Sequence, residues 1–291
     1  MKSKPPRKLI TFDWAMKRLL RSKANFEILE GFLSELLNDD IVILELLESE
    51  SNKDSATDKY NRVDLKVKNS VGELVIIGIR NEREFDYLHR IFCETTQAIT
   101  EHQQAEEVPR TEKAISITIL YFDLGRGSDY IYRGETSFTG IHNQEHLQLS
   151  SRQQQLFGKE QIYHLFPEYY LIRIKNFNDI ATTTLDEWIY FLKNEEIKDG
   201  FKAKGIQKAK KAFSLLSLPE KDRLAYERYK YELSYQASII ESNYGLGRLE
   251  GREEGEKVKA LEVATKLKRK GATLEEIMDL TGLTKEEIER V

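Results

Sequence analysis

The sequence predicts a mixed α/β fold, and three observations carry that prediction. Short apolar or alternating runs have the period of β-strands, at residues 41–47, 62–68, 74–79 and 115–122. Two longer segments repeat apolar residues at the three- and four-residue spacing of helices, at residues 12–37 and 84–102. The resulting order, α-β-β-β-α-β, is typical of a central sheet covered by helices.

The first elements follow from local chemistry. The helical pattern of residues 12–37 is interrupted near residues 22–25, which divides it into two helices. Residues 49–60 are polar and are expected to form a loop. Residues 74–79 are apolar on both faces, which predicts a central strand that is covered on both sides.

The elements after residue 122 are less regular. We expect a turn and a short tyrosine-rich strand within residues 125–134, and another strand within residues 169–177. A helix opens at Thr184, because acidic residues in its first turn favour the helix dipole. A basic helical segment at residues 198–216 follows, and a further helix begins at Pro219.

These elements divide the chain into four parts. Residues 1–10 are expected to be a flexible arm, and residues 11–243 one domain with a helical extension from about residue 184. The glycine-interrupted, charged residues 244–256 are interpreted as a linker. Residues 257–291 contain two capping boxes, each opening a short helix, which predicts a small helix-turn-helix-like tail.

Composition and charge limit the classes of protein to which the chain can belong. The chain has 291 residues and 40% hydrophobic residues, so a sizeable core is possible. Its net charge of -4 argues against a generally basic coat for nucleic acid, but not against a local basic groove. A single cysteine excludes an intrachain disulfide and a cysteine-based zinc site. No apolar run approaches the length that spans a membrane, and a cytoplasmic protein fits these features.

The most informative stretch joins Asp64 to the apolar strand that carries Gly78 and Arg80. Residues 78 and 80 of a strand point to the same face. The chain around this stretch resembles the recombination-promoting nuclease, or putative transposase, family of the PD-(D/E)XK nuclease superfamily. The resemblance covers roughly residues 10–255 and is carried by separated segments that agree in order, at residues 12–20, 25–33, 47–52, 61–64, 82–90, 121–125, 167–170 and 185–193.

The resemblance implies a PD-(D/E)XK core, αβββαβ, and a Mg²⁺-dependent DNA endonuclease linked to recombination or transposition. It places Asp64 at the family's metal-binding aspartate. It favours Glu30, on the helix before the strands, as the extra acid and second metal ligand; the alternative is that Glu30 is a solvated helix residue. The family's Ile-Glu-Ile-Gln pattern is here Ile-Gly-Ile-Arg. Gly78 therefore stands at the glutamate position, and Arg80 at the position of Gln, or of Lys elsewhere in the superfamily.

These two substitutions affect the chemistry of the site. Mg²⁺ prefers oxygen ligands, and glycine supplies none from a side chain. Arg80 stays charged and pairs readily with a carboxylate or a phosphate, so we expect it to bind Asp64 in place of a metal ion, or to bind DNA phosphate. An alternative is rescue by Glu82, which lies two residues further along the same strand face.

DNA is the expected partner, and basic residues are the candidates for phosphate contact. Residues 201–230 hold nine Lys or Arg against three Asp or Glu, and the dense part consists of Lys202, Lys204, Lys208, Lys210 and Lys211. The acidic tail favours docking or self-association through the C-terminal helices over DNA reading. Two hypotheses remain open: a nuclease with an impaired active site, and a catalytically inactive DNA-binding or self-associating module of the same fold.

Overall fold

The computed structural model describes residues 9–47, 64–81, 86–104 and 113–290 of the chain. A six-stranded mixed sheet forms the centre of the first of two compact units, which extends to Tyr226. The strand order is β1-β2-β3-β4-β6-β5. The strands are β1 (Ile43–Leu47), β2 (Leu65–Asn69), β3 (Leu74–Arg80), β4 (Ala114–Leu120), β5 (Ile131–Gly134) and β6 (Glu168–Arg173).

The three central strands β3, β4 and β6 run parallel, whereas β1, β2 and β5 are paired antiparallel to their neighbours. Every residue of β4 is buried, and only Arg80 of β3 is partly exposed. This burial confirms the prediction of a central, doubly covered strand at residues 74–79 and explains why those residues are apolar without alternation.

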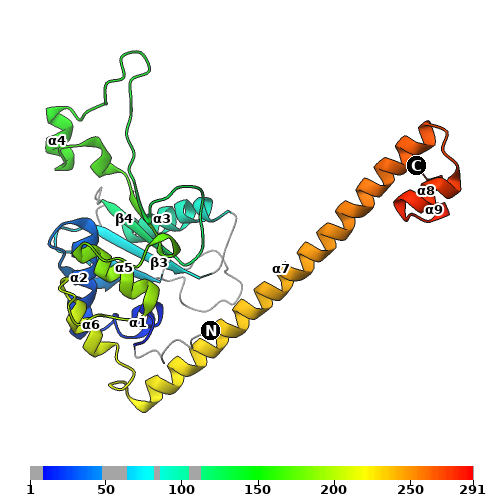
Figure 1. Cartoon of the computed structure of the whole chain (residues 1–291). Coiled ribbons are helices and arrows are strands. Elements are labelled where there is room, and N and C mark those ends of the chain that lie inside the picture. Colours follow the sequence, from blue (N-terminus) through cyan, green and yellow to red (C-terminus); the bar gives the residue numbers. More distant parts are fainter. Residues whose placement is uncertain (1–8, 48–63, 82–85, 105–112, 291) are drawn as a thin grey trace. The chain divides into compact units, whose positions relative to one another are not determined.

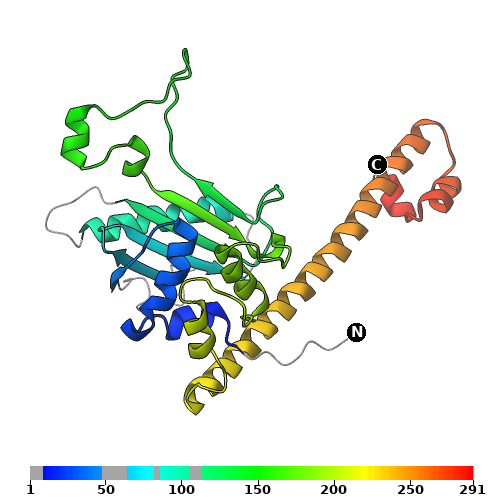
Figure 2. The same ribbon diagram turned by 60° about the vertical axis from the view of Figure 1, so that its left-hand side comes forward.

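Helices cover both faces of the sheet (Figures 1 and 2). One face packs against α3, and the other against a group of helices that includes α1, α2, α5 and α6. The helices of this unit are α1 (Phe12–Arg18), the 3-10 helix η1 (Lys23–Asn25), α2 (Phe26–Leu37), α3 (Tyr87–Gln104), α4 (Ser151–Phe157), the 3-10 helices η3 (Ile162–Leu165) and η4 (Ile174–Asn176), α5 (Thr184–Asn194), α6 (Ile206–Ala212) and the start of α7 (Glu220–Arg269).

Aromatic side chains fill the core on the α1 and α2 face. Phe12 of α1 makes edge contacts with Phe32 of α2 and with Trp188 and Phe191 of α5, at ring-centroid distances of 5.5, 6.3 and 6.2 Å. All four side chains are at most 1% exposed. This cluster fixes α1 against α2 and α5, and α1 carries one side of the site described below.

Close backbone contact holds the turn before α6 against α2. A Cβ atom built on Gly31 would lie 2.1 Å from the carbonyl oxygen of Lys204. Gly205 has a positive φ of 75°, and a Cβ there would lie 2.8 Å from the carbonyl oxygen of Glu27. Both positions therefore require glycine.

The second unit, from Glu227 onward, has its own small core. It consists of most of α7 with α8 (Leu274–Thr281) and α9 (Lys285–Glu289). Ala264, Ile277, Leu283 and Ile288 form the buried cluster. Both predicted capping boxes are present at the starts of α8 and α9, opened by Thr273 and Thr284.

Several local predictions need correction. Residues 244–256, interpreted as a linker, lie inside the continuous helix α7. Their glycines lower helix propensity, but the charged and apolar residues between them are good helix formers. The basic segment 198–216 is helical only over Ile206–Ala212. Asp64 forms a bend just before β2 and is not part of the strand.

The ends of other predicted segments also differ. Of the predicted arm, residues 1–8 lie outside the described part, whereas Leu9 and Ile10 are buried and pair with Ser214 and Phe213. The predicted loop at residues 49–60 lies outside the described residues. The interruption between the first two helices is confirmed, since α1 and α2 are separate.

Candidate active site

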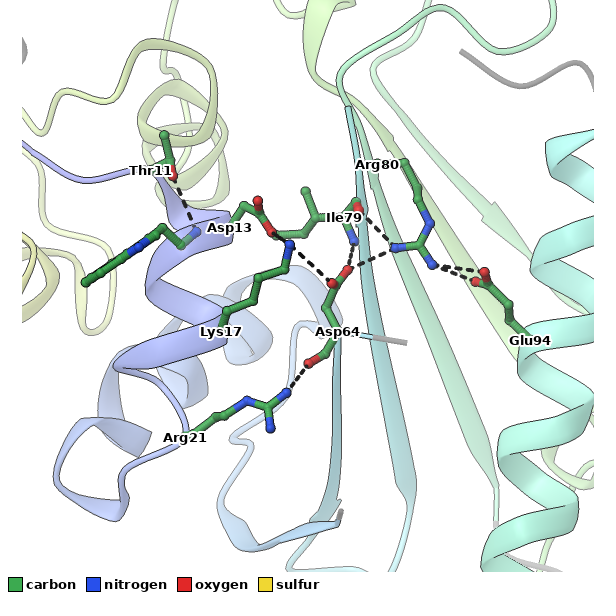
Figure 3. Close-up of polar contacts among 9 residues, drawn as sticks. Thr11, Asp13, Lys17, Arg21, Asp64, Ile79, Arg80 and Glu94 are labelled. Carbon is green, nitrogen blue, oxygen red and sulfur yellow. Dashed lines mark hydrogen bonds and ion pairs between the residues drawn. The ribbon is translucent and has the colours of Figure 1, made fainter. Parts of the chain in front are cut away.

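Asp64 lies between α1 and the end of β3, and its carboxylate is almost completely buried (Figure 3). Its backbone N–H donates to the carbonyl of Ile77 at 3.1 Å, which extends the pairing of β2 with β3. Its Oδ2 atom accepts hydrogen bonds from the backbone N–H of Ile79 at 2.6 Å and from Nη1 of Arg80 at 2.9 Å. The backbone of β3 and the Arg80 side chain thus hold one oxygen of Asp64 in a fixed position.

The Arg80 guanidinium lies directly over Gly78. A Cβ atom built on Gly78 would lie 3.4 Å from Nη1 and 3.5 Å from Nη2 of Arg80. The two residues share a face of β3, as the period of the strand predicted. The guanidinium therefore occupies the space into which a longer side chain at position 78 would extend.

Glu94 of α3 is the second carboxylate at this guanidinium. Both of its oxygens accept from Nη2 of Arg80, at 3.0 and 2.9 Å. The Glu94 side chain is 9% exposed and is also 3.8 Å from Nε of Arg90, one turn earlier on α3. Glu94 was not among the site residues expected from the sequence, although a signal was present. Helical spacing places this acid on the buried face of α3 with Tyr87, Ile91 and Ala98.

Helix α1 contributes a second ion pair beside Asp64. Lys17 lies 3.0 Å from Asp13, one turn earlier, and 3.8 Å from Oδ1 of Asp64. The Asp13 side chain is 5% exposed. The Thr11 hydroxyl caps α1 by accepting from the Trp14 N–H, so the helix start that positions Asp13 is itself fixed (Figure 3). Of the helices that precede the strands, α1 therefore brings an acid, Asp13, to the side of Asp64.

Glu30, expected as the extra acid, has a different contact. Its Oε1 accepts from the backbone N–H of Ile43 at 2.8 Å, at the start of β1. Among the described residues, no hydrogen bond or ion pair joins Glu30 to Asp64. Glu30 therefore ties α2 to an edge strand in this structure.

Burial and neighbouring charges act in opposite directions on the pKa values of Asp64, Glu94 and Arg80. Burial raises the pKa of Asp64, while Arg80 and Lys17 oppose that rise. Burial likewise raises the pKa of Glu94, again opposed by Arg80. Burial opposes the charge of Arg80, but Tyr87, Asp64 and Glu94 together raise its pKa above its ordinary value. Arg80 is therefore the permanent cation between two carboxylates.

The side chains present do not fit a Mg²⁺ site of the kind that the resemblance implies. The described residues contain no group of three His, Cys, Asp or Glu side chains placed to hold a metal ion. Position 78 offers no carboxylate, and the oxygens of Asp64, Glu94 and Ile79 that face this space are taken by Arg80. A divalent cation at these oxygens would lie next to the guanidinium, and the two positive charges would repel each other. Glu82 lies outside the described residues.

The five candidate lysines for DNA contact differ in their pairing. Lys204, Lys208 and Lys210 form ion pairs with Asp40, Glu27 and Asp199. Lys202 and Lys211 are exposed and form no ion pair with a residue that the structure describes. The structure places only Ile206–Ala212 of this segment in a helix, so the five side chains do not follow one helical face.

The fold and the site define a mixed α/β protein whose buried aspartate precedes the strand pair β2 and β3, as in a PD-(D/E)XK nuclease core. The model of the PD-(D/E)XK nuclease family transposases matches residues 10–242. The chain belongs to this family. No protein among curated sequences and no solved structure matches it. Within the described residues, none of the helices is long and apolar enough to cross a membrane.

Proposed function

We propose that this chain is a DNA-directed protein of the nuclease family transposases whose metal-dependent phosphodiester hydrolysis is disabled. The observation that carries the proposal is the Arg80 guanidinium, which binds Asp64 at 2.9 Å and lies over Gly78. Hydrolysis in such a site needs a cation that polarises the phosphate and lowers the pKa of a bound water. An arginine in that place supplies charge but binds no water as a Lewis acid, so the nucleophile is not generated.

Comparison with a variant that restores both family residues tests this proposal. Purified wild-type chain and Gly78→Glu/Arg80→Gln are incubated with supercoiled plasmid and Mg²⁺ or Mn²⁺. We expect nicking by the double variant only. Adding Asp64→Asn to the double variant should abolish the nicking, which controls for contaminating nuclease. Metal-dependent nicking by the wild-type chain that is lost in Asp64→Asn would contradict the proposal and favour a working site with another ligand, such as Glu82.

A DNA-binding role without cleavage is consistent with the family and with the exposed amines of Lys202 and Lys211. The net charge of the chain is negative, so binding would depend on such local positions. A link to recombination or transposition and a cytoplasmic location, both expected from the sequence, remain predictions.

Self-association is a second candidate function, and exposed apolar residues on α7 favour it. Tyr231, Tyr235, Leu246 and Leu249 are 73%, 59%, 59% and 53% exposed within the chain. Apolar residues repeated along one helix are typical of surfaces that pack against another helix. Light scattering after gel filtration should give a mass above the monomer, reduced to the monomer by Leu246→Asp/Leu249→Asp. A monomer at all concentrations would contradict this role.

A further inference from the structure

We infer that Arg80 is an internal counter-ion in an oxygen-lined cation position, and that Glu94 completes this position as a carboxylate from α3. Removal of Arg80 alone, with Gly78 retained, should therefore turn the position into a divalent-cation site that depends on Glu94. This inference rests on the proposed function, because it assumes that Arg80 has taken the place of a metal ion.

The guanidinium of Arg80 is surrounded by oxygen acceptors. Nη1 donates to Oδ2 of Asp64 and to the carbonyl oxygen of Ile79, each at 2.9 Å. Nη2 donates to the two oxygens of Glu94, at 3.0 and 2.9 Å. These four acceptors, all in the described part of the chain, are oxygens, and two of the three groups that supply them are carboxylates. Carboxylate and carbonyl oxygens are also the ligands that Mg²⁺ and Mn²⁺ prefer.

The two carboxylates and the guanidinium are deeply buried. The side chains of Asp64, Arg80 and Glu94 are 9%, 11% and 9% exposed. Two carboxylates at this depth need a compensating cation, because a buried charge without a partner is strongly unfavourable. With Arg80 removed, the cations left within 4 Å of these two carboxylates in the described part of the chain are Lys17 beside Asp64 and Arg90 beside Glu94, both at 3.8 Å. Neither lies within hydrogen-bond distance of its carboxylate.

The Arg80 side chain fills the space between Asp64 and Glu94. Arg80 lies over Gly78 and is flanked by the Tyr87 ring, whose centroid is 5.9 Å from the guanidinium carbon. A shorter neutral side chain at position 80 vacates the volume between Asp64 and Glu94. Gly78 adds no side chain to fill it. A divalent ion is smaller than the guanidinium, and it retains bound waters. These waters would bridge the distance between the ion and a carboxylate that it does not touch directly.

The experiment compares three forms of the full chain with Mn²⁺ as the probe: wild type, Arg80→Gln and Arg80→Gln/Glu94→Gln. Electron paramagnetic resonance measures bound Mn²⁺, and thermal unfolding is followed in EDTA and in Mn²⁺. We expect no Mn²⁺-dependent change in the Tm of the wild type. Arg80→Gln should have a lower Tm in EDTA, regain several degrees in Mn²⁺, and bind Mn²⁺ at least tenfold more tightly than Arg80→Gln/Glu94→Gln.

Each other outcome overturns the inference. Folded Arg80→Gln that binds Mn²⁺ no better than the wild type shows that the oxygens do not form a cation position. Equal binding by both variants shows that Glu94 is not a ligand. If Arg80→Gln fails to fold in EDTA and also in Mn²⁺, the metal does not replace the missing charge. The proposed function fails separately, through plasmid nicking by the wild type.

Discussion

Arg80→Met removes the positive charge from the buried pair of carboxylates while it keeps much of the side-chain volume. Arg80, Asp64 and Glu94 are 11%, 9% and 9% exposed, so Arg80→Met leaves two buried acids without their shared cation. Breaking a buried ion pair by removing one partner costs about 3–5 kcal/mol. For a unit of this size, each kcal/mol lowers the Tm by roughly 2–4 °C. The expected loss is therefore about 6–20 °C.

The loss should depend on pH in a defined direction. Arg80 lowers the pKa values of Asp64 and Glu94, so its removal raises both further above their unfolded-state values. A carboxyl whose pKa is raised in the folded state binds its proton more tightly there than in the unfolded chain. Its contribution to stability therefore grows as the pH falls through the folded-state pKa and is lost as the pH rises. The Tm deficit of Arg80→Met should shrink between about pH 7 and pH 4.

The assay is thermal unfolding followed by circular dichroism across that pH range. The matched control is Arg80→Met with Asp64→Asn and Glu94→Gln, which removes all three charges. Most of the lost stability should return in the control, because a neutral group replaces the buried ions. A loss under about 2 °C at pH 7, or a loss that does not change with pH, refutes the buried-counter-ion reasoning.

Three further changes probe other parts of the molecule. Gly31→Ala places a Cβ 2.1 Å from the Lys204 carbonyl oxygen. Urea unfolding should therefore show a loss of stability of about 1–3 kcal/mol or more. An unchanged midpoint of urea unfolding would contradict this close approach of the two backbones. Gly245→Ala, with nothing within 4 Å of the added Cβ, should stabilise α7 by up to about 1 kcal/mol in the same assay. Lys202→Ala/Lys211→Ala should weaken DNA binding measured by fluorescence anisotropy and reduce the slope of log K against log salt by about 0.9 for each phosphate that is no longer neutralised. Unchanged affinity and slope would remove these two lysines from the DNA surface.

The sequence was sufficient for the local elements of the site. Period-two and apolar runs located β2 and β3, and strand geometry placed Gly78 and Arg80 on one face. The pairing of Arg80 with Asp64 could also be predicted, because a charged guanidinium near a carboxylate has few better partners. It could not be decided from the sequence whether a DNA phosphate would compete for the same side chain.

The extra acids could not be assigned in the same way. Glu30 and Asp13 both lie on helices before the strands, and Glu30 was the residue expected from the sequence. The structure pairs Glu30 with the Ile43 N–H and brings Asp13, with Lys17, to the side of Asp64. The choice depends on the rotation of α1 and α2 about their axes, which the aromatic packing of Phe12 determines.

The sequence by itself determined the secondary-structure periods, the family and the two substituted positions. Each of these can be recognised from residues that are neighbours or regularly spaced in the chain. Only the tertiary structure decided that Glu94 reaches Arg80 from α3 and that Lys204, Lys208 and Lys210 are paired with acids. These contacts join residues that no helix or strand period relates, between 11 and 181 positions apart in the sequence. Periodicity shows which face of an element is buried, whereas the packing of whole elements decides which side chain lies opposite.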